Sequence, residues 1–281
     1  MVVKDHNAYD AFYPTIQVDD VGRIHLTWHE ADRGDESPRK SNVYYTRSTD
    51  GGMEFDKPTR LNKVKSASAF SRFTLDGSTG PLVATAWSDF RNGQWDIMIA
   101  RSFDAGVTWE EVEVIPNHKG ADFNPDLLVT VSGELHLIWH NSVVVQNIPI
   151  SHIMYASSMD FGTTWSEPRQ MSPNQGRFPE WTIKPDSSAF AFFWLDEQNF
   201  GKSELCPLPQ RCSDVALTYS VDGGNEWEGV EFIQYEGQQS ILVHSAAFFP
   251  DGRPIVVWSM QNGDSKSQRV YTKVRKTPLP F

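Results

Sequence analysis

Short apolar segments that end in tryptophan recur along the chain, and a turn of polar residues and glycine precedes each of them. The tryptophans are Trp28, Trp87, Trp139, Trp194 and Trp258. A further segment lies before each turn, opened by Phe12, Phe70, Phe123, Phe178 or Leu242. Short apolar segments bounded by turn residues are typical of β-strands. The pattern therefore predicts five copies of one strand–turn–strand unit.

A second motif keeps step with the first. It reads STDGGMEF at 48–55, SFDAGVTW at 102–109, SMDFGTTW at 158–165 and SVDGGNEW at 220–227. Its aspartates at 50, 104, 160 and 222 are 54, 56 and 62 residues apart, the size of a four-stranded propeller blade with its loops. An aspartate in such a turn accepts backbone hydrogen bonds and the glycine allows a positive φ. Because four equivalent copies cannot share one active site, we expect these aspartates to be structural.

Together the two patterns predict an all-β fold, a single β-propeller domain of five four-stranded blades. The expected blades are roughly 11–65, 66–120, 121–175, 176–238 and 239–281, the last completed by residues 1–10. The fifth copy lacks the aspartate turn and stops after its third strand. The stretch from Val2 to Asp10 resembles a fourth strand, so we expect it to close the ring and to leave no open sheet edge.

Composition and charge limit the classes of binding partner that we expect. The formal net charge of −11 and the pI of about 5.2 disfavour nucleic acid and anionic membranes. No run approaches the roughly 18 apolar residues of a membrane span, and the N-terminus is too polar for a signal peptide, so an export signal was removed or never existed. Cys206 and Cys212 flank a proline-bearing loop, where both a local disulfide and two free thiols remain open. We expect a monomer without a cofactor or a bound metal.

Connectivity sorts the loops of a propeller between two faces. The aspartate turns join the third and fourth strands on one face, and the other face carries the loops that enter the first strand and leave the second. Two residues after each tryptophan stand Glu30, Asp89, Asn141, Asp196 and Met260. The carboxylates among them either tie strands to loops or supply the acid and base of a glycosidase, which requires two carboxyls about 5 to 9.5 Å apart.

The copies disagree most two residues after the first strand opens. Pro14, Arg72, Pro125, Glu180 and His244 stand there. Divergence among otherwise equivalent positions is what we expect of a binding site. Arg72, with Arg91 or Arg177, has the planar donor fork that binds a carboxylate or sugar hydroxyls, and Glu180 and His244 titrate or hydrogen-bond. Tyr13, Trp181 and Trp95 offer rings on which a sugar can stack.

The four aspartate turns, with the preceding W-x-[DEN] at Trp28, Trp87, Trp139 and Trp194, resemble the BNR or Asp-box repeats of the sialidase superfamily. The resemblance covers almost the whole chain and implies a propeller that handles glycans outside the cytoplasm, in the periplasm or extracellular space. It also implies an alternative ring of six blades, which is usual for sialidases. The F-R-I-P motif of sialidases is absent, because the first strand reads Phe12, Tyr13, Pro14, Thr15 with tyrosine at the arginine position.

Two functions follow as hypotheses. The first is a glycoside hydrolase that uses carboxylates among Glu30, Asp89, Glu180 and Asp196 and binds substrate through Tyr13, Arg72, Arg91, Arg177, Trp181 and His244. The second is a noncatalytic, lectin-like propeller that binds a glycan or a protein through the same face. Whether the chain is an enzyme stays open at this point, as does the identity of the sugar.

Overall fold

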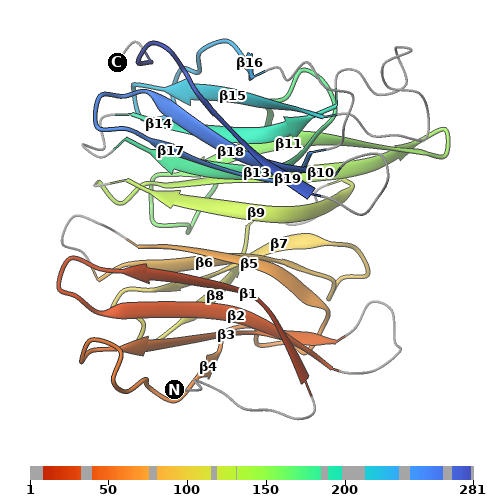
Figure 1. The fold of residues 1–281 in the computed structure, drawn as a ribbon. Coiled ribbons are helices and arrows are strands. Elements are labelled where there is room, and N and C mark those ends of the chain that lie inside the picture. The colour runs from red at the N-terminus through yellow and green to blue at the C-terminus, as the bar shows by residue number, and fades with distance from the viewer. Residues whose placement is uncertain are drawn as a thin grey trace. The chain divides into compact units, whose positions relative to one another are not determined.

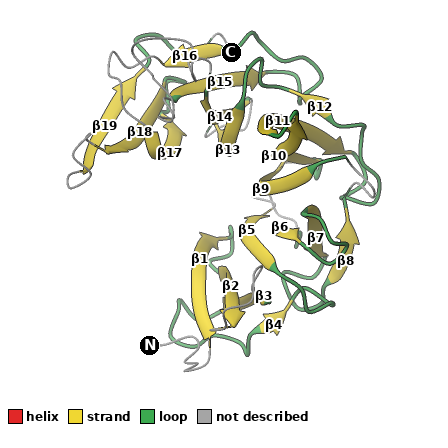
Figure 2. Cartoon of the chain, turned by 90° about the vertical axis from the view of Figure 1, so that its right-hand side faces the viewer, coloured by secondary structure: helices red, strands yellow, loops and turns green. Residues whose placement is uncertain are grey.

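A computed structural model describes residues 9–32, 40–75, 81–114, 119–130, 132–184, 189–197, 213–233, 241–261 and 268–279 of the chain. These residues form strands, turns and loops, and no helix occurs among them (Figure 2). Five antiparallel sheets follow one another along the sequence (Figure 1). Most of the expected closing strand and the Cys206–Cys212 loop lie outside the described residues.

The strand bounds repeat the predicted order. The first sheet holds β1 (Tyr9–Val18), β2 (Ile24–Asp32), β3 (Ser41–Ser48) and β4 (Thr59–Arg60); the second holds β5 (Ser68–Leu75), β6 (Val83–Asp89), β7 (Asp96–Ser102) and β8 (Glu110–Glu113). The third holds β9 (Ala121–Val129), β10 (Leu135–Val145), β11 (Ile148–Ser158) and β12 (Arg169–Gln170). The fourth holds β13 (Gly176–Ile183), β14 (Phe190–Asp196), β15 (Asp214–Ser220) and β16 (Glu231–Ile233); the fifth holds β17 (Ile241–Phe248), β18 (Pro254–Gln261) and β19 (Gln268–Val274).

One detail at the N-terminus differs from the prediction. Tyr9 and Asp10, which the sequence placed in the closing strand, pair with Asp32 and Ala31 of β2. They therefore extend the first strand of the first sheet. The closing strand itself, the blade boundaries and the single domain stay predictions.

The chain divides into two compact units, residues 1–149 with 156–168 and residues 150–155 with 169–281. In the first unit the middle strands of the second sheet are buried on both faces, and Trp87, Phe73 and Tyr45 pack in one apolar cluster. In the second unit Phe193 and Trp258 occupy a similar cluster. Removing a ring of this size from a core costs about 3–5 kcal/mol, so each of these buried rings contributes substantially to the stability of its unit.

The aspartate turns have the hydrogen bonds that their sequence predicts. Asp104 Oδ1 accepts from the Thr108 amide at 2.8 Å and from the Ser102 hydroxyl at 2.7 Å, and its Oδ2 accepts from the Thr108 hydroxyl at 2.6 Å. The bonds from Thr108 lower the pKa of Asp104 to about 2. In the first unit a strand arginine also reaches the turn of the next sheet, because Arg47 Nη1 donates to the Ala105 carbonyl at 2.6 Å.

The two ends of each sheet have different contents. In the first sheet Ser48, which begins the aspartate turn, pairs with Ile24 at the start of β2, whereas Ala11 of β1 pairs with Glu30 near its end. The second sheet repeats this, with Ser102 opposite Val83 and Ser68 opposite Asp89. The aspartate turns thus lie at one end of the sheet and the start of the first strand at the other, as connectivity predicts.

Candidate functional site

All five first strands shift their pairing register near their start, and in β1, β5, β9 and β13 the shift is a β-bulge that contains a residue of positive φ. The bulged residue has a positive φ and is not glycine: Tyr13 at 50°, Phe70 at 59°, Asn124 at 48° and Phe178 at 54°. At each bulge two residues face one on the neighbouring strand, and the pairing register shifts. A bulge of this kind re-aims the side chains beside it, and bulges and backbone strain both concentrate at functional sites.

The bulge corrects the alignment of the repeats. In each sheet, one residue of the first strand pairs with the second-strand residue that immediately precedes the tryptophan. These residues are Thr15, Arg72, Asp126, Glu180 and Ser245, and we call them the first-strand set. The sequence aligned Pro14, Pro125 and His244 with Arg72 and Glu180, which is wrong by one residue. The opening Phe12 and Phe123 precede the bulged residue, whereas Phe70 and Phe178 are the bulged residues themselves. Counting from the opening residue therefore gives two different registers.

In the first unit the set combines three chemistries. Arg72 is exposed and has no ion pair or side-chain hydrogen bond within the described ranges. Asp126 is half-buried and its Oδ1 accepts from the Leu127 amide at 3.1 Å. The Thr15 hydroxyl lies 2.6 Å from that of Thr27. A cation, a carboxylate and a hydroxyl thus occupy equivalent places on successive first strands, and the sequence analysis missed Asp126 and Thr15.

In the second unit the two members of the set contact each other. The Ser245 hydroxyl donates to Glu180 Oε1 at 2.8 Å, joining β17 to β13. Glu180 is half-buried and Ser245 is exposed. His244 pairs through its backbone with Trp258, one position before Ser245. A half-buried carboxylate of this kind is able to accept a ligand hydrogen bond or to exchange a proton.

The carboxylates that follow the tryptophans have a different role. Glu30 Oε1, Asp89 Oδ2 and Asp196 Oδ2 accept from the indole Nε1 of their own Trp28, Trp87 and Trp194, at 2.9, 3.0 and 3.1 Å. All three carboxylates are buried. A buried indole N–H needs such a partner, so this bond fixes each tryptophan in its core.

The third sheet supports this interpretation, because asparagine replaces the carboxylate there. Trp139 Nε1 donates instead to Asp122 Oδ1 at 2.7 Å, and Asn141 Nδ2 donates to the same oxygen at 2.8 Å. When the usual acceptor is absent, a carboxylate from the neighbouring strand supplies it. The indole bond is therefore the recurring feature, and it explains why W-x-[DEN] repeats.

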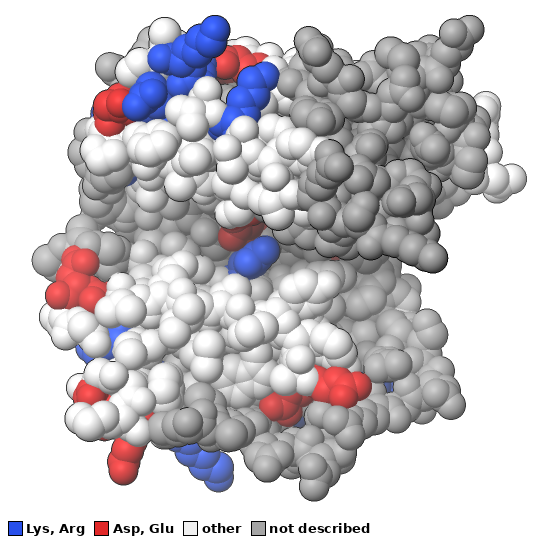
Figure 3. All heavy atoms as spheres, viewed as in Figure 1, with Lys and Arg blue, Asp and Glu red and all other residues white. Residues whose placement is uncertain are grey.

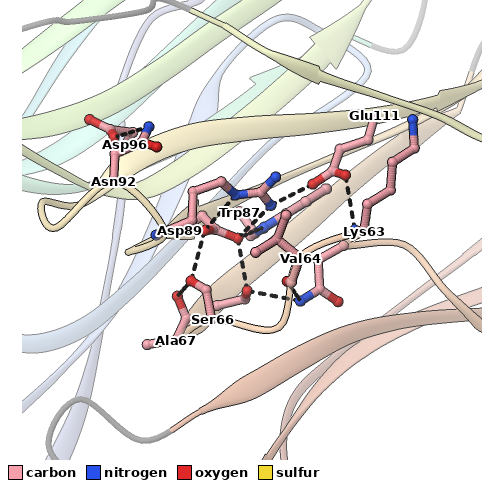
Figure 4. A network of polar contacts seen from close by, with 12 residues as sticks. Lys63, Val64, Ser66, Ala67, Trp87, Asp89, Asn92, Asp96 and Glu111 are labelled. Atoms are coloured by element: carbon pink, nitrogen blue, oxygen red, sulfur yellow. Dashed lines mark hydrogen bonds and ion pairs between the residues drawn. The ribbon is translucent and has the colours of Figure 1, made fainter.

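Asp89 accepts several further hydrogen bonds besides that of its indole (Figure 4). It accepts from Ser66 and Ser68 hydroxyls at 2.8 and 2.9 Å and from Arg91 Nε and Nη2, both at 2.9 Å. Arg91 Nη2 also donates to Glu111 at 2.5 Å. Burial alone raises the pKa of Asp89, but the bonds from Arg91 and Trp87 outweigh it and hold that pKa below its usual value. Asp89 therefore stays ionised, and Arg91 is engaged inside the sheet.

Two further predicted site residues are also held by their neighbours. Arg177 pairs with Glu197, and its guanidinium lies 5.6 Å from the ring centre of Phe178. Trp181 is only 8% exposed and packs edge-on against Phe192 and Phe190, with ring centres 5.3 and 5.6 Å away. Tyr13, in contrast, is 56% exposed.

Among the side chains that the structure describes, no group of three or more His, Cys, Asp or Glu is placed to hold a metal ion. No helix long and apolar enough to cross a membrane occurs in the described residues either.

Comparison with solved structures identifies the class. A crystal structure of a protein of unknown function from Dyadobacter fermentans is similar, with a TM-score of 0.64 and 14% identity over 97% of this chain and 84% of that one. An α-L-arabinanase from Penicillium chrysogenum, complexed with arabinobiose, has a TM-score of 0.59 and 16% identity over 92% and 79%. A leech intramolecular trans-sialidase has a TM-score of 0.60 and 10% identity over 97% and 57%. The protein is an all-β propeller, which confirms the predicted fold class.

Sequence comparison identifies the family. The BNR repeat-like domain matches residues 80–249, more than half of the chain. The chain therefore belongs to the BNR repeat-like domain family, and its predicted resemblance to BNR repeats of the sialidase superfamily is confirmed. No curated protein sequence matches it significantly. At identities of 10–16% the structural likeness concerns the fold alone.

Proposed function

We propose that this propeller binds glycans, and hydrolyses them if it is an enzyme, through the first-strand set and the loops around it. The observation that carries the proposal is the register position shared by Arg72, Asp126 and Glu180. Each follows a bulge with a residue of positive φ, each is at least partly accessible, and together they comprise one guanidinium and two carboxylates. The arabinobiose held by one structural neighbour and the trans-sialidase activity named for another favour a glycan as the ligand class.

The residues have distinct roles in this proposal. Arg72 offers a planar fork of N–H donors to sugar hydroxyls or to a carboxylate. In the second unit Glu180 acts as the acid, the base or a hydrogen-bond acceptor, and in the first unit Asp126 offers a carboxylate that accepts hydrogen bonds from sugar hydroxyls. Glu30, Asp89 and Asp196 hold their tryptophans in place. A glycan of this kind is met outside the cytoplasm, so the proposal includes a periplasmic or extracellular location.

A noncatalytic, lectin-like propeller is the alternative. It is favoured by one observation: three of the four carboxylates that the sequence singled out are buried and bonded to indoles. Turnover of any chromogenic glycoside by the wild type, lost in Glu180→Gln, decides for the enzyme. Binding without turnover decides for the lectin-like protein.

The proposal is tested with four glycans: arabinobiose, arabinotetraose, 3′-sialyllactose and an oligogalacturonate. Calorimetry measures binding, and chromogenic glycosides measure turnover. We expect at least one glycan to bind the wild type, and Arg72→Ala and Glu180→Gln to weaken that binding about tenfold or more at an unchanged thermal midpoint. The matched control is Asp104→Ala at the opposite end of its sheet, which lowers the midpoint and leaves affinity unchanged. Wild-type affinity in both first-strand variants contradicts the proposal.

A further inference from the structure

Four aromatic rings form a continuous stack in the first unit, running from the bulge of β1 over the end of β2 to the bulge of β5. The ring centres of Phe12 and His29 lie 5.4 Å apart and those of Tyr13 and His29 lie 5.5 Å apart, with interplanar angles of 24° and 21°. Tyr13 and Phe70 follow at 5.5 Å and 55°. We call these four residues the ring stack.

The ring stack presents an uncharged aromatic surface. Tyr13 is 56% and Phe12 38% exposed, whereas His29 is buried between them. Burial lowers the pKa of His29 to about 4, so its imidazole is neutral at neutral pH. In Figure 3 the described surface over β1 and β2, in the lower half of the view, carries mainly uncharged side chains. A ligand for this surface needs an apolar, uncharged face.

The bulge itself does not require these rings. A positive φ is unfavourable for a bulky aromatic residue and much easier for asparagine. Asn124 occupies the equivalent position in β9 with a φ of 48°, so asparagine suffices to form the bulge. Tyr13 and Phe70 bear the same strain with larger side chains, and Tyr13 gains little burial in return. Neither backbone geometry nor core packing accounts for a tyrosine at position 13.

We propose that the ring stack binds a neutral sugar ring of the glycan, an inference that rests on the function proposed above. The C–H face of a sugar lies flat against an aromatic ring, because the face of the ring is electron-rich and apolar. Polar groups flank the stack: the Thr15 hydroxyl follows Tyr13, and Arg72 follows Phe70. One sugar on Tyr13 and its neighbour near Arg72 make a site for an oligosaccharide of at least two units.

The test replaces Tyr13 with the residue that the equivalent bulge already contains. Tyr13→Asn keeps the bulge conformation and removes only the ring, so we expect an unchanged thermal midpoint. Arabinotetraose should bind the wild type more tightly than arabinobiose does, and Tyr13→Asn should weaken arabinotetraose about tenfold, as expected for loss of one aromatic contact. Tyr13→Phe should restore wild-type affinity, because stacking uses the ring and not the hydroxyl.

The matched control is Ile16→Thr, which changes a 63% exposed apolar residue on the same strand that belongs to no stack. It should leave the affinity for arabinotetraose unchanged. If Tyr13→Asn binds arabinotetraose like the wild type, or if Ile16→Thr weakens it equally, the ring-stack proposal is wrong and the proposed function stands. If 3′-sialyllactose binds and arabinotetraose does not, the proposal of a neutral sugar on the ring stack is wrong, and the proposed function again stands. If none of the four glycans binds at millimolar concentration, both proposals are wrong.

Discussion

Asp89 and Arg72 lie on adjacent strands of the second sheet, yet their surroundings are opposite. Asp89 is fully buried and accepts hydrogen bonds from two serines, an indole and a guanidinium. Arg72 is exposed, without an ion pair in the part of the chain that the structure describes. Sequence position alone made both of them site candidates. The difference teaches that a polar residue repeated in step with the tryptophans stabilises the repeat, whereas one that varies between repeats is available to a ligand.

The largest effect on stability is expected from replacing the buried Asp89. Asp89→Ala removes the buried acceptor shared by the Arg91 guanidinium, the Trp87 indole and two serine hydroxyls, which we expect to lower the free energy of unfolding by about 3 kcal/mol. Chemical denaturation measures this. If the alanine variant does not fold, Asp89→Asn keeps the volume and should give a smaller loss. A loss below that of Arg72→Ala would contradict the assignment of Asp89 to the scaffold.

The pH dependence of stability tests two buried histidines of the first unit. Burial lowers the pKa of His29 and of His136 from 6.5 to about 4. The unfolded chain therefore binds these protons at a higher pH than the folded one. Their contribution is complete above pH 6.5 and falls as the pH drops towards 4, by at most about 1.4 kcal/mol per pH unit for each histidine. Denaturation between pH 7 and 4 should show this slope, and a shallower one in His29→Gln; equal slopes would count against the buried, neutral state.

The aspartate turns should respond more weakly. Asp104→Ala removes acceptors from an exposed turn, so we expect a loss of about 1 kcal/mol. The folded pKa of Asp104 lies below its ordinary value of 3.8, so this contribution is present above that pH and disappears as the pH falls towards 2. Asp104→Ala and the wild type should therefore converge in stability near pH 2. A difference that persists there would mean that the turn is stabilised by something other than the ionised carboxylate.

The smallest effect on stability is expected from replacing the exposed Arg72. Arg72→Ala should change the free energy of unfolding by less than about 0.5 kcal/mol, because an exposed side chain without an ion pair contributes little to stability. Thermal and chemical denaturation together check this. A loss of 2 kcal/mol or more would place Arg72 in the scaffold with Asp89 and remove the contrast between the two residues.

The sequence predicted the repeat because its signals are local and periodic. The tryptophan strands and the aspartate turns recur at fixed offsets, and their hydrogen bonds follow from residue types within a few positions. The bulges could not be predicted in the same way, because nothing in Phe12-Tyr13-Pro14 announces a positive φ at an aromatic residue. That one extra residue moved the expected site from Pro14 and Pro125 to Thr15 and Asp126.

Side-chain accessibility was the other property beyond the reach of sequence. Trp181 follows Glu180 directly and was expected at the surface with it. Neighbouring residues on a strand point to opposite faces, and Trp181 pairs with Phe192 and packs among aromatic rings of the second unit. Glu180 thus occupies a half-buried polar position, whereas Trp181 lies in the core. Only the register of β13 against β14 shows which is which.

The central claim is that a ligand contacts the first-strand set and not the carboxylates bonded to tryptophan, and one pair of isosteric variants tests it most directly. Glu180→Gln and Glu30→Gln each replace a carboxylate with an amide, and calorimetry with the best-binding glycan of the four gives the affinity of each folded variant. Glu180→Gln should lose about tenfold or more in affinity at an unchanged thermal midpoint, whereas Glu30→Gln should lower the midpoint and bind like the wild type. Weakened binding in folded Glu30→Gln, together with wild-type affinity in Glu180→Gln, would contradict the account.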